Sequence, residues 1–105
     1  MIRFLVTYDR PADPEAFDRH YRTVHAPLTR RLPRLLAYTV HRQPRAVRGA
    51  AYYQVVELTW QDRETAEAAF ASPEGRATAA DMANLDAPTR SCLYEVLDQP
   101  PDSHR

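Results

Sequence analysis

The 105-residue chain contains no lysine, only two glycines and a single cysteine. Without lysine, the protein cannot form a Schiff base on a side-chain amine. Gly49 and Gly75 are too few and too far apart for a phosphate-binding P-loop or a dinucleotide fingerprint. Cys92 has no partner in the chain for a disulfide. We therefore expect a protein that works without a cofactor.

The chain also lacks an excess of either charge sign and has no long apolar run. The 14 basic and 14 acidic side chains cancel, so nothing recruits nucleic acid or an anionic membrane surface. No apolar run approaches the roughly 20 residues that span a bilayer. The N-terminal segment 1–6 is too short and too alternating for a signal peptide. We expect a soluble cytoplasmic protein with neither nucleic acid nor membrane as a partner.

Periodicity and capping residues predict the order β-α-β-β-α-β. Alternating or β-rich segments predict strands over 2–8, 35–43, 51–60 and 91–97. Asp13, Asp62 and Ser72 are expected N-caps of helices. This order is typical of the α+β ferredoxin-like fold, with a four-stranded antiparallel sheet and helices on one face. We expect one domain over 1–97 and a disordered, proline-broken tail over 98–105.

The period of two along each strand assigns side chains to the two sheet faces. Tyr94 falls on the face covered by helices, Tyr53 and Leu93 fall on the far face, and Cys92 is expected to be a small buried apolar residue. The far face mixes apolar residues with matched charges, which suits a homodimer formed sheet on sheet, although a solvated face is the simpler alternative. Its members include Arg3, Leu5, Val55, Glu57 and Glu95.

His25 and Pro27 interrupt an apolar helical stripe that runs from Phe17 to Leu32. Pro27 lacks an N–H and disfavours the helical conformation of Ala26, so we expect the helix to kink or break at His25. Histidine is the side chain that exchanges protons near neutral pH. We therefore propose His25 as a catalytic acid or base. The alternative is that its ring hydrogen-bonds a carbonyl freed by Pro27 and holds the break.

Four side chains are expected to face His25 from the helix-covered side of the sheet or from its own helix. Phenol hydroxyls can hold a substrate oxygen or stabilise an enolate, and their rings form an apolar wall. A lone amide among apolar neighbours needs a partner, which a ligand can supply. Such a cavity would suit a flat molecule that carries a phenol or a carbonyl. These candidate substrate-binding residues are Tyr8, Tyr21, Tyr38 and Gln54.

No metal site is expected. His20 and His25 are five residues apart and should diverge on an α-helix, since five residues turn about 140° beyond one full circle. His41 belongs to the far sheet face and His104 to the tail. No HExxH motif or cysteine–histidine cluster is present.

Several segments along the chain carry a family resemblance: the opening strand over 2–8, Phe17, Tyr21, His25-Ala26-Pro27-Leu28, Leu32-Pro33, Tyr38-Thr39-Val40, Phe70-Ala71-Ser72-Pro73-Glu74-Gly75 and Asp81-Met82-Ala83-Asn84. With these segments the chain resembles the EthD-domain family of the dimeric α+β barrel superfamily over about residues 1–97. The resemblance implies a homodimer of two four-stranded sheets, with a small-molecule cavity between each sheet and its own helices. It also carries the histidine of the family over to His25, whereas Arg22 stands where the family often has a tryptophan.

Three functions remain open on these residues and this resemblance. EthD proteins are usually described as oxidoreductase-like, which implies a cofactor-independent monooxygenase acting on a small aromatic or polyketide-like substrate. The same histidine could serve a polyketide cyclase, a decarboxylase or an isomerase. A non-catalytic dimer that binds a hydrophobic ligand is the third. Fold alone does not separate them.

Overall fold

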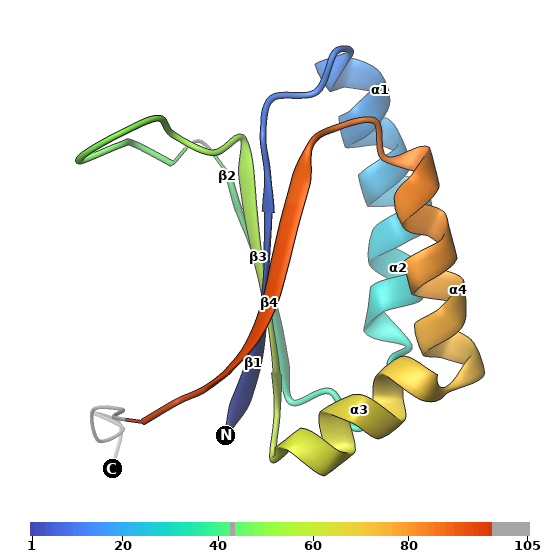
Figure 1. Cartoon of the computed structure of the whole chain (residues 1–105). Helices are drawn as coiled ribbons and strands as arrows, with labels where there is room; N and C mark the ends of the chain where they lie inside the picture. Colours follow the sequence, from blue (N-terminus) through green and yellow to red (C-terminus); the bar gives the residue numbers. More distant parts are fainter. Residues whose placement is uncertain (43, 98–105) are drawn as a thin grey trace, which may run out of the picture.

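The computed structural model describes residues 1–42 and 44–97. Four strands form one antiparallel sheet in the order β2-β3-β1-β4, and all helices lie on one side of it (Figure 1). The predicted α+β ferredoxin-like arrangement is confirmed. The elements are β1 (Ile2–Tyr8), α1 (Pro14–His20), the π-helical segment η1 (Tyr21–His25), α2 (Ala26–Arg30), β2 (Ala37–Arg42), β3 (Gln54–Trp60), α3 (Arg63–Ala71), α4 (Pro73–Asp81), the 3₁₀ segment η2 (Met82–Asn84) and β4 (Thr89–Glu95).

The three predicted N-caps are confirmed. Asp13 accepts a hydrogen bond from the backbone of Ala16 at 3.2 Å, and Asp62 accepts one from the backbone of Thr65 at 2.8 Å. Ser72 closes α3 and opens α4, with its hydroxyl oxygen 3.0 Å from the amide nitrogen of the third residue of α4. Each cap satisfies an amide that the first helical turn leaves unpaired, so these starts are decided locally.

The helix was expected to kink or break at His25; it does not break there, and the irregularity takes the form of a π-helical turn. The helix continues through Ala26, whose backbone is helical, by widening into the π-helical segment η1. The amide of Ala26 bonds to the carbonyl of Tyr21, five residues back, and Pro27 follows in the first turn of α2. In a π-helical turn the hydrogen bonds span five residues rather than four, so different carbonyls face the proline ring. The helix can therefore continue past Pro27, although this residue has no N–H to donate.

The predicted faces of the last strand are reversed. In the β1–β4 pairing, Phe4 stands opposite Leu93 and Arg3 stands opposite Tyr94. Leu93 therefore shares the face covered by helices, whereas Tyr94 lies on the far face. Cys92 also lies on the far face and is exposed rather than buried. Apolar residues alternate poorly in this segment, and a slip of one residue moves every side chain to the opposite face.

Tyr53 is also misplaced by the sequence analysis. The strand β3 begins at Gln54 rather than at 51, so Tyr53 precedes it at a bend. Its ring packs edge-on against Phe17 of α1, with ring centroids 5.7 Å apart. Its hydroxyl donates to the carboxylate of Asp18 at 2.9 Å, which ties the start of β3 to the first helix.

The core lies between the sheet and the helices. Trp60, Tyr8 and Gln54 are its largest fully buried side chains, and the indole of Trp60 donates to the carbonyl of Pro33 at 3.0 Å. No helix among the described residues is long and apolar enough to cross a bilayer. The predicted tail over 98–105 lies outside the described part of the chain.

Candidate active site

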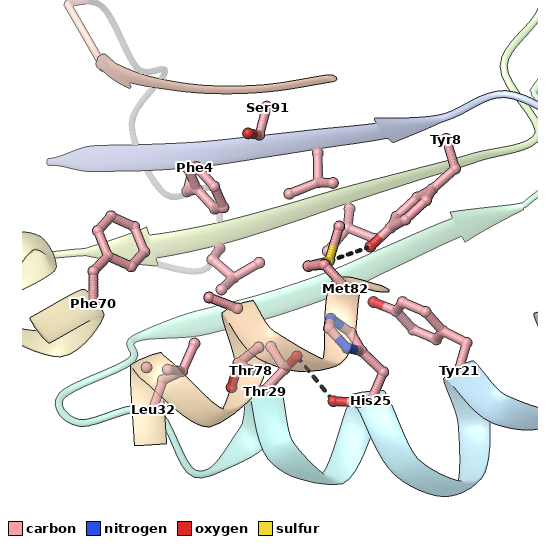
Figure 2. Close-up of a pocket in the computed structure, with 15 residues that line it drawn as sticks. Phe4, Tyr8, Tyr21, His25, Thr29, Leu32, Phe70, Thr78, Met82 and Ser91 are labelled. Atoms are coloured by element: carbon pink, nitrogen blue, oxygen red, sulfur yellow. Dashed lines mark hydrogen bonds between the residues drawn. The ribbon is translucent and has the colours of Figure 1, made fainter. Parts of the chain in front are cut away.

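A cavity of about 340 Å³ opens between the sheet and the helices. Its walls are mainly aromatic and aliphatic, with a few hydroxyl groups. Figure 2 shows Tyr8, Tyr21 and His25 together at one end, with Leu32 and Phe70 toward the other. Tyr21 and His25 are close, since their ring centroids are 5.2 Å apart. Cavities of this size and character hold small organic molecules.

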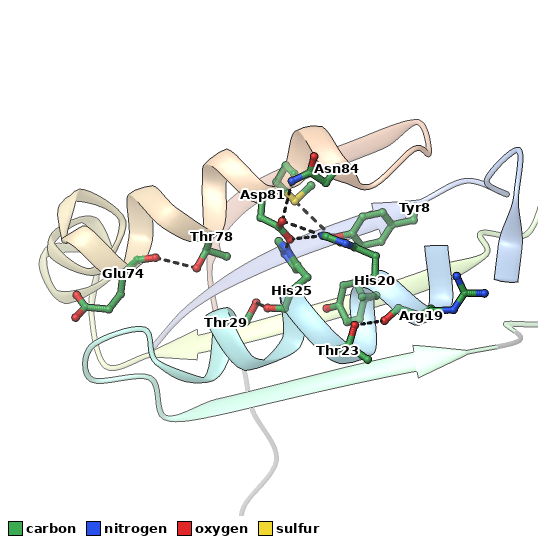
Figure 3. A network of polar contacts seen from close by, with 12 residues as sticks. Tyr8, Arg19, His20, Thr23, His25, Thr29, Glu74, Thr78, Asp81 and Asn84 are labelled. Carbon is green, nitrogen blue, oxygen red and sulfur yellow. Dashed lines mark hydrogen bonds and ion pairs between the residues drawn. The ribbon is translucent and has the colours of Figure 1, made fainter. Parts of the chain in front are cut away.

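His25 is positioned by the π-helical turn and is almost fully buried, with 4% of its surface exposed. Within the described parts of the chain its ring does not bond a backbone carbonyl, which was the alternative considered above. Instead, Nδ1 lies 2.9 Å from Oδ2 of Asp81 (Figure 3). Among the described residues Nε2 has no hydrogen-bond partner, and it belongs to a ring that lines the cavity.

Asp81 is the candidate site residue that the sequence analysis missed. It ends α4, 56 residues from His25 in sequence, and it is buried. Asn84 donates to Oδ1 at 3.0 Å, and His20 Nε2 lies 2.9 and 3.0 Å from the two oxygens (Figure 3). The sequence contained one signal for this residue. Asp81 is an acidic residue in the last turn of a helix, where its charge is disfavoured by the negative end of the helix dipole.

The expectation that His20 and His25 diverge is wrong, because both rings contact Asp81. His20 immediately precedes η1 and His25 is its last residue. Residues five apart come round to one side when the turn is π-helical rather than α-helical. The wider turn therefore builds a polar cluster from two histidines and one carboxylate. In the described parts of the chain no group of three or more such side chains is arranged to hold a metal ion.

Burial lowers the pKa of His25 below its ordinary value of 6.5, although the hydrogen bond and the charge of Asp81 act in the opposite direction. Burial alone would raise the pKa of Asp81, but hydrogen bonds from Asn84, His20 and His25 outweigh it and lower that pKa. Near neutral pH the pair is therefore a neutral imidazole and an ionised carboxylate. Since the carboxylate only accepts, Nδ1 carries the proton and Nε2 keeps a lone pair.

The phenols beside the imidazole are neutral. Burial raises the pKa of both Tyr8 and Tyr21 well above the ordinary value of 10.0. The hydroxyl of Tyr8 lies 3.7 Å from the sulfur of Met82, a weak contact that a ligand oxygen could displace. Tyr8 therefore offers a hydroxyl donor beside the base, and Tyr21 offers the face of its ring.

Two of the predicted substrate-binding residues lie elsewhere. Tyr38 and Gln54 line a second pocket of about 270 Å³, and Tyr21 lines both pockets. The hydroxyls of Tyr21 and Tyr38 are 2.8 Å apart. The structure therefore gathers His25, Tyr8 and Tyr21 around the main cavity, whereas Tyr38 and Gln54 line the second pocket, where Tyr38 contacts Tyr21.

The sequence and the fold are similar to those of known proteins. The profile of the EthD domain matches residues 9–88. The chain belongs to the EthD family. This EthD protein is 37% identical over 87 residues to an uncharacterized 11.0 kDa protein from the thcB-thcC intergenic region of Rhodococcus erythropolis, a match that covers 81% of this chain and 84% of the relative.

Two solved structures extend the comparison. An ethyl tert-butyl ether D (EthD) family protein from Bacillus halodurans C-125 is 31% identical, with a TM-score of 0.84 over 92% of this chain and 99% of the other. A mutant of SnoaB, a cofactor-independent oxygenase from Streptomyces nogalater, is 19% identical, with a TM-score of 0.71 over 96% of this chain and 97% of the other. The second likeness establishes a shared fold.

Proposed function

We propose that this EthD protein is a cofactor-independent monooxygenase that acts on a small aromatic or polyketide-like molecule, with His25 as the general base. The observation that carries the proposal is the 2.9 Å contact between His25 Nδ1 and Asp81 Oδ2 at the wall of a largely apolar cavity. A base held in one tautomer beside a flat apolar space suits the deprotonation of a phenol or an activated methylene.

The first step transfers a proton from the substrate to Nε2 of His25. The imidazolium that forms is stabilised by the carboxylate of Asp81, as in other histidine–carboxylate pairs. The negative charge left on the substrate spreads onto its oxygen, which the neutral hydroxyl of Tyr8 can approach as a donor. The apolar walls exclude water and strengthen these electrostatic interactions.

The oxidation step uses dioxygen as the co-substrate. The electron-rich carbanion supplies the electrons, so a methylene flanked by aromatic rings and one O₂ become a carbonyl and one water. One oxygen atom enters the product, and the other leaves with the two methylene hydrogens. The description of SnoaB as a cofactor-independent oxygenase supports this direction. Acid–base chemistry alone, as in a cyclase, a decarboxylase or an isomerase, would use the same first step without oxygen.

The test is oxygen uptake with a panel of anthrones and hydroquinones. We expect one O₂ consumed per quinone formed from an anthrone. His25→Asn should lower the rate by at least about 100-fold, because it removes Nε2 while its amide can still donate to Asp81. Arg48→Gln is the control, since that exposed arginine belongs to the loop between β2 and β3. Full activity of His25→Asn would disprove the role of the base.

The other outcomes select another function. Product formed without oxygen uptake would replace the monooxygenase by an acid–base enzyme at the same histidine. Tight binding of panel compounds without any product would indicate a ligand-binding protein.

The proposal includes a homodimer that forms through the far face of the sheet. Leu5 and Val55 are half-buried there, Cys92 is exposed, and Arg3 and Glu57 supply charges of both signs. A second copy turned by a two-fold axis could cover the apolar residues and pair the charges. Native mass spectrometry should give twice 12.1 kDa, and Val55→Glu should give the monomer. A monomeric wild-type protein would refute the dimer.

A further inference from the structure

The second pocket lies on the other side of Tyr21 from the main cavity. It is bounded by η1 and α2 on one side and by β2 and β3 on the other. Three of its lining residues are arginines, namely Arg22, Arg30 and Arg42. Nothing in the chemistry proposed above uses this pocket.

Gln54 carries a buried donor in this pocket that has no partner within residues 1–42 and 44–97. None of its surface is exposed. Arg42 Nε lies 2.7 Å from Oε1, and because a guanidinium only donates, this contact fixes which end of the amide is oxygen. Nε2 is then left without a hydrogen bond among the described residues. A buried amide nitrogen in this state is costly, so it calls for an acceptor.

The charges that line the pocket also favour an acceptor, because the positive charges outnumber the negative ones. Among the residues that the structure describes, Asp18 is its only lining carboxylate, and it is bound by Arg42 at 2.8 Å and by the hydroxyl of Tyr53. Within the described residues, no ion pair engages Arg22 or Arg30. The lining therefore holds two uncompensated positive charges.

The phenols add one more donor. The hydroxyls of Tyr21 and Tyr38 lie 2.8 Å apart, so one of them donates to the other. The proton of the second hydroxyl is then free for a third group. Arg30 also lies over the ring of Tyr38, 6.0 Å from its centroid. Donors therefore outnumber free acceptors along the described lining of the pocket.

We propose that this pocket binds the carboxylate of a small organic acid. The amide of Gln54 and one phenol would donate to the carboxylate oxygens, and Arg22 and Arg30 would neutralise its charge. A singly charged, planar group matches neutral donors at the buried end and arginines at the exposed end. The acid is either a separate metabolite or the acidic group of the molecule bound in the main cavity.

The test is titration of the ¹⁵N-labelled protein with benzoate, with benzyl alcohol as the neutral control. We expect benzoate to shift the side-chain amide of Gln54 with saturable millimolar affinity, and benzyl alcohol to leave it unchanged. Gln54→Met, close in size but without donors, should weaken benzoate binding about tenfold or more. Arg30→Gln should weaken it as well, whereas Arg48→Gln, which removes the same charge from an exposed loop, should not.

The shifts also distinguish the two sources of the acid. Shifts confined to the second pocket indicate a separate metabolite. Shifts that extend to Thr78 and Ser91 of the main cavity indicate an acidic group on the substrate. Unchanged binding in both Gln54→Met and Arg30→Gln, or shifts at Thr78 and Ser91 alone, would overturn the proposal. Binding is measured without turnover, so failure of the oxygenase proposal leaves this result intact.

Discussion

Replacing Asp81 with asparagine should leave the site nearly unchanged in shape and remove its base. Asn84 donates to Oδ1 of Asp81, whereas His25 contacts Oδ2. An asparagine at position 81 keeps its oxygen toward Asn84 and therefore places its NH₂ group against His25 Nδ1. Nδ1 must then accept, which moves the imidazole proton to Nε2. The nitrogen that should take the substrate proton would already carry one.

The size of the effect follows from the same contacts. Holding histidine in the wrong tautomer, without a carboxylate to stabilise the imidazolium, costs about 10⁴-fold in rate in a comparable histidine–carboxylate pair. The buried bond to His25 changes from a charged to a neutral one, a loss of about 1 kcal/mol. His20 is partly exposed, so its weakened bond contributes about 1 kcal/mol at most. A total near 2 kcal/mol should lower Tm by roughly 10 °C.

Long-range ¹H–¹⁵N NMR of the histidine rings tests this without any substrate. In the wild type, His25 should be the Nδ1–H tautomer near neutral pH and should titrate below 6.5. In Asp81→Asn it should be the Nε2–H tautomer and titrate lower still, because a buried charge has lost its partner. Asp86→Asn is the matched control, since it removes an exposed carboxylate from the same segment.

Two results would refute the reasoning. One is a wild-type His25 that carries its proton on Nε2 or titrates above 6.5. The other is an Asp81→Asn protein with the wild-type tautomer and wild-type turnover.

Three further predictions concern stability. A Cβ at Gly75 would overlap the carbonyl oxygen of Ala69, so Gly75→Ala should lower the free energy of unfolding by about 2 kcal/mol in calorimetry; an unchanged Tm would contradict the close approach of α3 and α4. Ser72→Ala removes the cap of α4 and should cost about 1 kcal/mol in urea unfolding; a loss within error would show that the cap is dispensable. The unfolded chain protonates His25 near its ordinary pKa of 6.5, whereas the folded chain does so only at lower pH, so the free energy of unfolding should fall as the pH drops below 6.5. It should fall again as Asp81 is protonated below its ordinary pKa of 3.8. A free energy of unfolding that does not change over this pH range would contradict both pKa directions.

Local features of the sequence were sufficient for most of the fold. The caps at Asp13, Asp62 and Ser72 were predicted correctly because each interaction spans three residues. The alternation in β1 was equally clear. In β4 the same method was wrong, because apolar residues stand on both faces and the pairing with β1, rather than the pattern, selects the register.

The candidate site was only partly predictable. His25 and its tyrosine neighbours could be proposed from residue chemistry and from the kink or break that Pro27 was expected to cause at His25. The π-helical turn that replaced this break was not predictable, because it depends on the balance between the proline and the packing of the whole helix. It also reversed the expectation for His20.

The amino-acid sequence by itself determined the order of strands and helices, the capped starts of the helices and the family, since these depend on contacts between near neighbours and on the period of apolar residues. Only the tertiary structure joined Asp81 to His25, and only it placed Gln54 and Tyr38 in a different pocket from Tyr8. The reason is that hydrogen bonds across 56 residues and the walls between pockets arise from how the helices lie on the sheet. No local pattern records that packing.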